Sequence, residues 1–171
     1  MPNLKIRVYP DPDLRVKAEE VTNVGLKEKK ELEDMAAAMY LNNGVGLAAT
    51  QVGIRKQLIV IDIGEGLVKL ANPVLTAEAG KETGEEGCLS VPGECITIKR
   101  AKNVVVDFLN ENSFPSRIKA DGLLARALQH EIDHLQGKLI VDYLNPVKKF
   151  LVRARSGNKK GKNGTWNCIK K

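Results

Sequence analysis

Several features that mark secreted, membrane-bound or disulfide-stabilised proteins are missing from this sequence. Its 171 residues include only three cysteines, Cys88, Cys95 and Cys168, with no C-x-x-C pair, which favours a reducing compartment over a disulfide framework. The first residues, MPNLKIRVYPDPDL, contain no apolar run and no Arg-rich amphipathic pattern, so we expect neither a secretory signal nor a transit peptide. No stretch approaches the roughly 20 apolar residues of a membrane span. We therefore expect a cytoplasmic protein that has no contact with a membrane.

Acidic residues are missing from the C-terminal end. Residues 148–171 hold nine of the 27 lysines and arginines and no Asp or Glu, which leaves 18 basic residues against all 21 acidic residues in 1–147. The formal net charge of +6 therefore comes from the end of the chain, and the body is mildly acidic. A nucleic-acid-binding domain would need basic residues in its folded body, so we expect no sequence-specific binding of nucleic acid.

Histidine is also scarce, and both histidines lie in the stretch QHEIDHLQ at 129–136. His130 and His134 are four residues apart, so on a helix they project from one face about one turn apart, which suits a shared metal ion. Glu131 follows the first histidine, where the H-E-x-x-H pattern places a general base. Asp121 as N-cap and Gly137 as C-terminal stop predict such a helix. The alternative is a solvated amphipathic helix that carries the pattern by chance.

Either a third metal ligand lies upstream of this helix, or the metal site does not exist. No Glu or His follows His134, so the ligand patterns of thermolysin-like and metzincin proteases cannot be completed. Cys88, in the turn-rich segment GEEGCLSVPG at 84–93, is the best candidate for a Cys-His-His site with its fourth position open to water. Cys95 and Cys168 compete for the role. Cys95 lies in the alternating segment ECITIKR, where we expect it to pack, and Cys168 lies in the basic tail.

A glycine-rich stretch, GVGLAATQVG at 44–53, marks a place where backbone passes close to another group. It matches neither a Walker phosphate loop nor the G-x-G-x-x-G fingerprint. One polar side chain, Gln51, stands among apolar neighbours. The stretch is either a turn with a chance glutamine or a loop of a functional site.

The remaining pattern predicts an α+β fold in one domain of about 1–150, followed by a basic and flexible tail at 151–171. An apolar stripe predicts a helix over 26–41, and the metal helix ends near 136. Alternation predicts short strands over 57–63, 67–76, 94–100, 103–109 and 114–120. This order of a helix, a run of strands and a second helix favours antiparallel β-sheets packed around a central metal-binding helix.

Three segments together resemble the signature motifs of peptide deformylases, in order and spacing: GVGLAATQ at 44–51, EGCLS at 86–90 and QHEIDHL at 129–135. The resemblance covers the core from about 4 to 147. It implies a peptide deformylase-like fold and a hydrolase that removes the formyl group from the N-terminal formyl-methionine of nascent chains, releasing formate.

The resemblance also implies roles for individual residues. Cys88, His130 and His134 would bind one divalent metal, commonly ferrous iron in this family, with zinc, nickel or cobalt as substitutes. Glu131 would take a proton from water and later protonate the leaving amine. The Gln51 side-chain amide and the Leu89 backbone N–H would stabilise the developing oxyanion.

Further resemblance concerns substrate binding and support of the metal loop. The backbone of Gly44, Val45, Gly46 and Gly87 would pair with the substrate as an added strand. Leu123 and Ala127 would line the methionine pocket. Glu86 would pair with Arg100 to support the metal loop.

Two features of the sequence depart from the family pattern, one residue in the expected pocket and the C-terminal tail. Arg126 stands where an aliphatic pocket residue is usual. It either lays its stem along the pocket with its charge in water or selects acidic groups further along the peptide, and we expect the first. The C-terminal tail, with glycines at 157, 161 and 164, replaces the long helix of many bacterial members. If the tail is not simply solvated, it would bind ribosomal RNA electrostatically, with Trp166 as a stacking group.

Two other functions stay open. The first is a non-catalytic relative that binds peptide ends, which the presence of Glu131, Gln51 and all three ligands disfavours. The second is a metalloprotease that cleaves internal bonds, which a closed, methionine-sized pocket would exclude. We expect a monomer.

Overall fold

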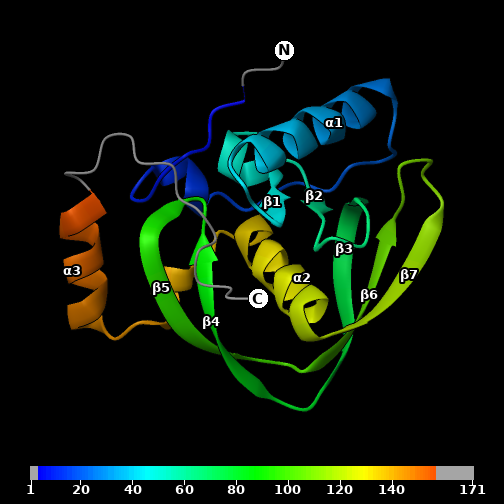
Figure 1. Ribbon diagram of the computed structural model, residues 1–171. Helices are drawn as coiled ribbons and strands as arrows, with labels where there is room; N and C mark the ends of the chain where they lie inside the picture. Colours follow the sequence, from blue (N-terminus) through cyan, green and yellow to red (C-terminus); the bar gives the residue numbers. More distant parts are fainter. Residues whose placement is uncertain (1–3, 157–171) are drawn as a thin grey trace.

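The computed structural model describes residues 4–156, which form two β-sheets and three α-helices (Figure 1). The larger sheet is antiparallel, with the strand order β1-β2-β3-β6-β7. The strands β4 and β5 form a separate antiparallel hairpin. The bounds of the seven strands are β1 Gly46–Ala48, β2 Leu58–Ile61, β3 Val68–Ala79, β4 Glu82–Cys88, β5 Val91–Arg100, β6 Asn103–Leu109 and β7 Pro115–Asp121.

Helix α2 (Gly122–Leu135) lies between the larger sheet and the hairpin (Figure 1). Its apolar face packs on the sheet in one buried cluster, in which Ala125 and Leu128 meet Ile59 and Val106. Another face directs His130, Asp133 and His134 toward the hairpin, where they contact Glu86, Arg100 and Cys88. The predicted α+β arrangement, with antiparallel sheets around one helix, is confirmed.

The ends of α2 are fixed by backbone geometry rather than by a side-chain cap. Asp121 precedes the helix as predicted, but its side chain makes no capping hydrogen bond. Gly137 ends the helix region with φ of 72°, and a Cβ at this position would lie 2.5 Å from the carbonyl oxygen of Arg15. The left-handed backbone and the close contact both require glycine here.

Helix α1 (Leu26–Leu41) covers strands β1 and β2 at one end of the sheet (Figure 1). It begins after Gly25, whose N–H donates to Oε2 of Glu28 at 3.1 Å. The predicted apolar stripe is buried, and it packs against β2 through residues that include Met35, Met39 and Leu58.

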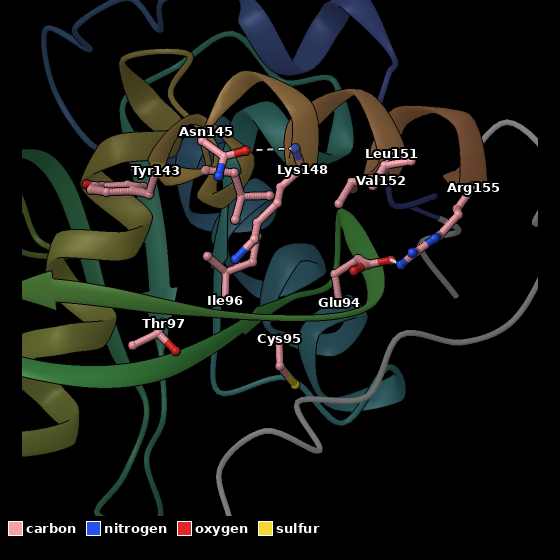
Figure 2. A pocket seen from close by; sticks show the side chains of 11 residues that line it. Glu94, Cys95, Ile96, Thr97, Tyr143, Asn145, Lys148, Leu151, Val152 and Arg155 are labelled. Carbon is pink, nitrogen blue, oxygen red and sulfur yellow. Dashed lines mark hydrogen bonds and ion pairs between the residues drawn. The ribbon is translucent and has the colours of Figure 1, made fainter.

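Helix α3 (Pro146–Ser156) lies beside β5 and crosses the domain boundary predicted at residue 150 (Figure 2). Val152 is buried against the hairpin, and Nη1 of Arg155 lies 3.8 Å from Oε1 of Glu94. The first six residues of the predicted tail are therefore helical. The rest of the tail, with Trp166 and Cys168, lies outside the described residues.

Two strands form where the sequence indicates turns. The turn-rich segment around Cys88 overlaps most of β4, and the glycine-rich stretch contains β1. Each strand gains its hydrogen bonds from a neighbour in the fold, β5 for β4 and β2 for β1, so local propensity is overridden by pairing. Between 4 and 156, no helix combines the length and the apolar character that crossing a membrane requires.

Candidate metal centre

Three potential metal ligands from two separate elements, the β4–β5 hairpin and helix α2, lie close together. Cys88 ends strand β4, and His130 and His134 occupy successive turns of α2. The Sγ atom of Cys88 lies 3.2 Å from Nε2 of His134, which lies 3.2 Å from Nε2 of His130. All three ligand atoms lie within 4.8 Å of one another, and all three residues are buried. A thiolate and two imidazoles converging on one point form a donor set that suits a divalent transition metal.

Glu86 fixes the orientation of the His130 ring. Its buried carboxylate contacts Nδ1 of His130 at 2.9 Å, so the other ring nitrogen faces Cys88 and His134. Arg100 donates to both oxygens of Glu86, from Nε at 2.6 Å and from Nη2 at 2.9 Å. Burial opposes ionisation of Glu86, but His130 and Arg100 outweigh it and lower the pKa of Glu86 to about 2. A carboxylate behind a histidine ligand is the usual device for orienting the ring.

The expectation that the Arg126 charge reaches water is wrong. The residue is 8% exposed, and its Nη1 donates to Oε1 of Glu86 at 2.9 Å and to the Ile98 carbonyl at 3.1 Å. Its Nη2 donates to the Glu82 carbonyl at 3.1 Å. A buried carboxylate within reach attracts the guanidinium more strongly than solvent does. The charge is therefore not available to select acidic peptide groups either.

Glu131 lies at the same centre, on the strand β1 side of α2. The residue is 1% exposed, and among the described residues its Oε2 has no hydrogen-bond partner. A Cβ at Gly46 would lie 2.4 Å from its Oε1, so the carboxylate rests directly against the backbone of β1. Burial raises the pKa of Glu131 to about 7, and the nearby Glu86 carboxylate acts in the same direction. A carboxylate with an unpaired buried oxygen is equipped to exchange a proton with a bound molecule.

The amide of Gln51 is held in one orientation. Its Oε1 accepts a hydrogen bond from the Ala48 backbone N–H at 2.8 Å. The NH2 group therefore points to the metal centre, 3.1 Å from Oγ of Ser90 and 3.6 Å from Sγ of Cys88. This explains a buried glutamine among apolar neighbours, because both ends of the amide find polar partners.

The residues expected to bind substrate surround the same centre. Gly46 begins β1, which is an edge strand of the larger sheet, and the Asp62 N–H donates to the Val45 carbonyl at 2.9 Å. Leu89 is buried at the turn between β4 and β5, and a Cβ at Gly44 would lie 2.7 Å from its Cδ1. The other expected positions are Gly87, which is buried before Cys88, Leu123, which is half-buried on the first turn of α2, and Ala127, which is buried in the core.

The structure adds residues that the sequence pattern does not single out. Asp133 accepts from Nη1 of Arg100 at 2.8 Å and from the Tyr143 hydroxyl at 2.7 Å, which extends the support of Glu86. Asp133 falls between the two histidines, so its place in the motif was a usable signal. Ser90 ends the EGCLS segment, which was a signal of the same kind, and Tyr143 gave none. Cys95 is exposed on β5 and lies outside the cluster, so the expectation that it packs is wrong.

Comparisons with known proteins agree with this geometry. The profile of the polypeptide deformylase family matches residues 3–150. A peptide deformylase from Caldanaerobacter subterraneus subsp. tengcongensis is 53% identical over 137 residues, covering 80% of this chain and 86% of the relative. A peptide deformylase from Thermodesulfovibrio yellowstonii is 44% identical over 162 residues, covering 92% of this chain and 98% of the relative. The solved structure of the Ehrlichia chaffeensis peptide deformylase in complex with actinonin is 37% identical, with a TM-score of 0.91 over 95% of this chain and all of the other.

Proposed function

Because the chain belongs to the polypeptide deformylase family, it is a hydrolase that deformylates peptides, and we propose that its Cys88, His130 and His134 centre performs this reaction on N-terminal formyl-methionine. The observation that carries the proposal is the buried Glu131 carboxylate, which has an unpaired oxygen beside three converging metal ligands. The products would be formate and a peptide with a free amine.

The donor set fits the metal that the family requires. Cys88, His130 and His134 would hold one divalent ion, and Glu86 orients one of the two imidazoles. The ion would make water more acidic and polarise the formyl carbonyl. We propose ferrous iron as the native ion from the family resemblance. Zinc, nickel and cobalt suit the same ligands.

Glu131 would move the proton in both halves of the reaction. Its unpaired oxygen can accept a proton from the attacking water, and the same oxygen can return the proton to the amine as the C–N bond breaks. The position of the carboxylate supports this role, since it is buried at the metal centre and rests against the edge strand β1.

Gln51 and Leu89 would stabilise negative charge on the formyl oxygen. The Gln51 amide is pre-oriented by Ala48, so its N–H groups already point to the metal centre, where one of them would exchange its contact with Ser90 or Cys88 for the formyl oxygen. The Leu89 backbone N–H lies in the turn after the metal ligand Cys88 and would supply a second donor. A pre-oriented donor at a developing oxyanion is worth about 3 to 4 kcal/mol.

The peptide would bind as an added strand beside β1. This strand pairs with β2 on one side only, so its other edge can hydrogen-bond a peptide backbone. Gly44, Val45, Gly46 and Gly87 would supply backbone contacts, which makes recognition tolerant of peptide sequence. Leu123 and Ala127 would face the methionine side chain, without Arg126, whose guanidinium is turned to Glu86.

We also propose that the protein works as a cytoplasmic monomer and meets nascent chains at the ribosome. The support is the excess of basic residues after 147, which would attract the acidic surface of ribosomal RNA. The alternative of a non-catalytic protein that binds peptide ends predicts affinity for formyl peptides without turnover.

Formate release tests the proposed reaction. Anaerobically purified protein loaded with Fe²⁺ or Ni²⁺ is expected to release formate from formyl-Met-Ala-Ser and to leave a blocked internal peptide intact. Glu131→Ala, with metal content measured and matched to wild type, is expected to lose at least about 100-fold in rate. Full metal occupancy without formate release would reject the deformylation reaction and favour the binding alternative.

A further inference from the structure

We propose that Arg126 is a positioning residue of the metal centre, which holds Glu86 against His130 and ties the hairpin that carries Cys88 to the helix that carries both histidines. This inference rests on the proposed function only in that the centre binds a metal ion. It replaces the pocket role that the sequence suggested for this arginine.

The first support is the shared carboxylate. Arg126 precedes His130 by one helical turn on α2, and both side chains contact Glu86. Nη1 of Arg126 donates to Oε1 of Glu86, and Nδ1 of His130 contacts Oε2, each at 2.9 Å. A guanidinium on one oxygen therefore helps to fix the angle at which the other oxygen meets the imidazole. Orientation of the ring in turn aims its second nitrogen at the ligand cluster.

The second support is the pair of contacts to the hairpin. Beyond Glu86, Arg126 donates to the Ile98 carbonyl on β5 and to the Glu82 carbonyl on β4, both at 3.1 Å. The metal ligands come from two elements that are 42 residues or more apart in sequence, Cys88 on β4 and the histidines on α2. One side chain therefore links the two elements directly. A flat guanidinium with several fixed N–H directions can make all these contacts at once, and a lysine ammonium cannot reproduce them.

The third support is charge balance. Glu86 is fully buried, and Arg100, its other cationic partner, also donates to Asp133 at 2.8 Å. Without Arg126, this one guanidinium would be shared by the buried Glu86 carboxylate and the half-buried Asp133 carboxylate. Arg126 adds a second guanidinium at Oε1 of Glu86, so the Glu86 charge stays balanced although Arg100 also binds Asp133. Loss of Arg126 would leave the buried Glu86 charge less fully compensated, by a guanidinium that Asp133 also binds.

Gly84 supplies an independent observation. It lies on β4 opposite the guanidinium, and a Cβ there would lie 2.9 Å from Nη2 and 3.0 Å from Cζ of Arg126. The backbone at Gly84 has no positive φ, so the close approach is the reason for glycine at this position. Because several hydrogen bonds hold the guanidinium, it cannot move aside freely. Gly84→Ala should therefore disturb Arg126 without touching any metal ligand.

Metal binding by the metal-free protein tests the proposal. Co²⁺ affinity is measured by competition with a chelator, and the ligand-field absorption of bound Co²⁺ reports ligand geometry. The variants are Arg126→Met, which keeps an unbranched apolar stem and removes the guanidinium, Arg126→Lys and Gly84→Ala. Arg117→Met is the matched control, because Arg117 pairs with Asp107 on the exposed face of β6 and β7.

We expect Arg126→Met to weaken Co²⁺ binding by about 10- to 100-fold and to shift the absorption bands. Arg126→Lys should bind Co²⁺ more tightly than Arg126→Met but should not show the wild-type spectrum. The Co²⁺ affinity of Gly84→Ala should lie between those of wild type and Arg126→Met. Arg117→Met should match wild type in both affinity and spectrum. Wild-type affinity and spectrum in a folded Arg126→Met protein would overturn the proposal. If Arg126→Met does not fold, unchanged binding and spectra in both Arg126→Lys and Gly84→Ala would overturn it.

These readouts separate the inference from the proposed reaction. Wild-type protein that binds Co²⁺ but releases no formate would reject the reaction and leave the role of Arg126 to be judged on metal affinity alone. Normal formate release by the wild type, together with unaltered metal binding in the Arg126 and Gly84 variants, would reject only the role of Arg126.

Discussion

Gly46 and Glu131 touch so closely that a Cβ on the glycine would lie 2.4 Å from Oε1 of the glutamate. The backbone of edge strand β1 therefore lies directly against the Glu131 carboxylate of helix α2, with no side chain between them. A peptide that pairs with β1 would lie beside the group proposed to move the proton. The same contact would therefore position both the proposed substrate strand and the proposed general base.

Substitution of Gly46 by alanine tests that contact. The added methyl group has to displace the Glu131 carboxylate, so we expect kcat for formate release to fall by about 100-fold or more. Co²⁺ affinity should stay near wild type, because neither residue is among the three ligands.

Gly25→Ala is the control for Gly46→Ala. A Cβ at Gly25 would lie 3.3 Å from Glu28 Oε2 at the start of α1, a tight contact outside the metal centre. We expect a small loss of stability with unchanged kcat. Wild-type kcat in Gly46→Ala, confirmed as folded by circular dichroism, would contradict the proposed contact between strand and base.

Gln51→Ala should lower kcat by about 10² to 10³-fold with little change in metal affinity, because it removes a pre-oriented donor that acts on the transition state. Single-turnover formate release and chelator competition measure the two quantities. Gln129→Ala is a matched control, because the Gln129 amide is also buried but bonds to the Ala101 backbone, with N–H···O distances of 3.0 Å in both directions. That variant should lose about 1 to 3 kcal/mol of unfolding free energy and keep its kcat. Equal kcat losses in the two variants would argue against an oxyanion role for Gln51.

The sequence indicated the metal helix and most of the larger sheet because their signals are local. Two histidines four residues apart share a helix face whatever the rest of the chain does. Strands β2, β3, β6 and β7 alternate or run apolar over several residues, so burial and strand preference agree. Leu26–Leu41 carries its apolar stripe in the same way.

Features that depend on distant partners could not be read from the sequence. Strand β4 contains Gly84 and Gly87, which indicate a turn, yet Gly84 is glycine because the Arg126 side chain fills the space a Cβ would take. The direction of Arg126 itself depends on Glu86, which lies 40 residues earlier in the chain. Helix α3 begins at Pro146 in a segment rich in basic residues, and only its packing on β5 shows that Val152 is a core residue.

Val152 provides a stability test of the α3 contact. The residue is 5% exposed in the cluster that joins α3 to the hairpin, whereas Phe150 on the same helix is 70% exposed. Val152→Ala should lower the free energy of unfolding by about 1 to 2 kcal/mol, since it leaves a small cavity, and Phe150→Ala should change it by less than about 0.5 kcal/mol. Urea titration measures both. Equal effects of the two substitutions would show that α3 is not docked on β5.

Asp142 links the N-terminal segment to α3 through two ion pairs. These ion pairs lead us to expect that the free energy of unfolding depends on pH. Asp142 pairs with Arg15 and accepts from Nζ of Lys149 at 2.5 Å. Burial opposes its ionisation, but Arg15 and Lys149 outweigh burial and hold the pKa of Asp142 well below its ordinary value. Because the pKa of Asp142 is lower in the folded protein, its ionised carboxylate stabilises the fold. This stabilisation is fully present above the pKa of the unfolded state, about 3.9, and is lost as the pH falls through the lower pKa of the folded state. Asp142→Asn should therefore cost about 1 to 2 kcal/mol at pH 7.

The same cost should shrink when urea titrations are repeated below about pH 4, because the wild-type carboxylate then becomes protonated in the unfolded protein while it stays ionised in the folded protein, so folding has to release a proton. Glu111→Gln is the comparison, since Glu111 pairs with Lys69 but its side chain is 49% exposed, so solvent screens the pair. We expect that variant to differ from wild type by less than about 0.5 kcal/mol at either pH. A cost for Asp142→Asn that stays constant from pH 7 to pH 3 would show that its effect comes from packing rather than from charge.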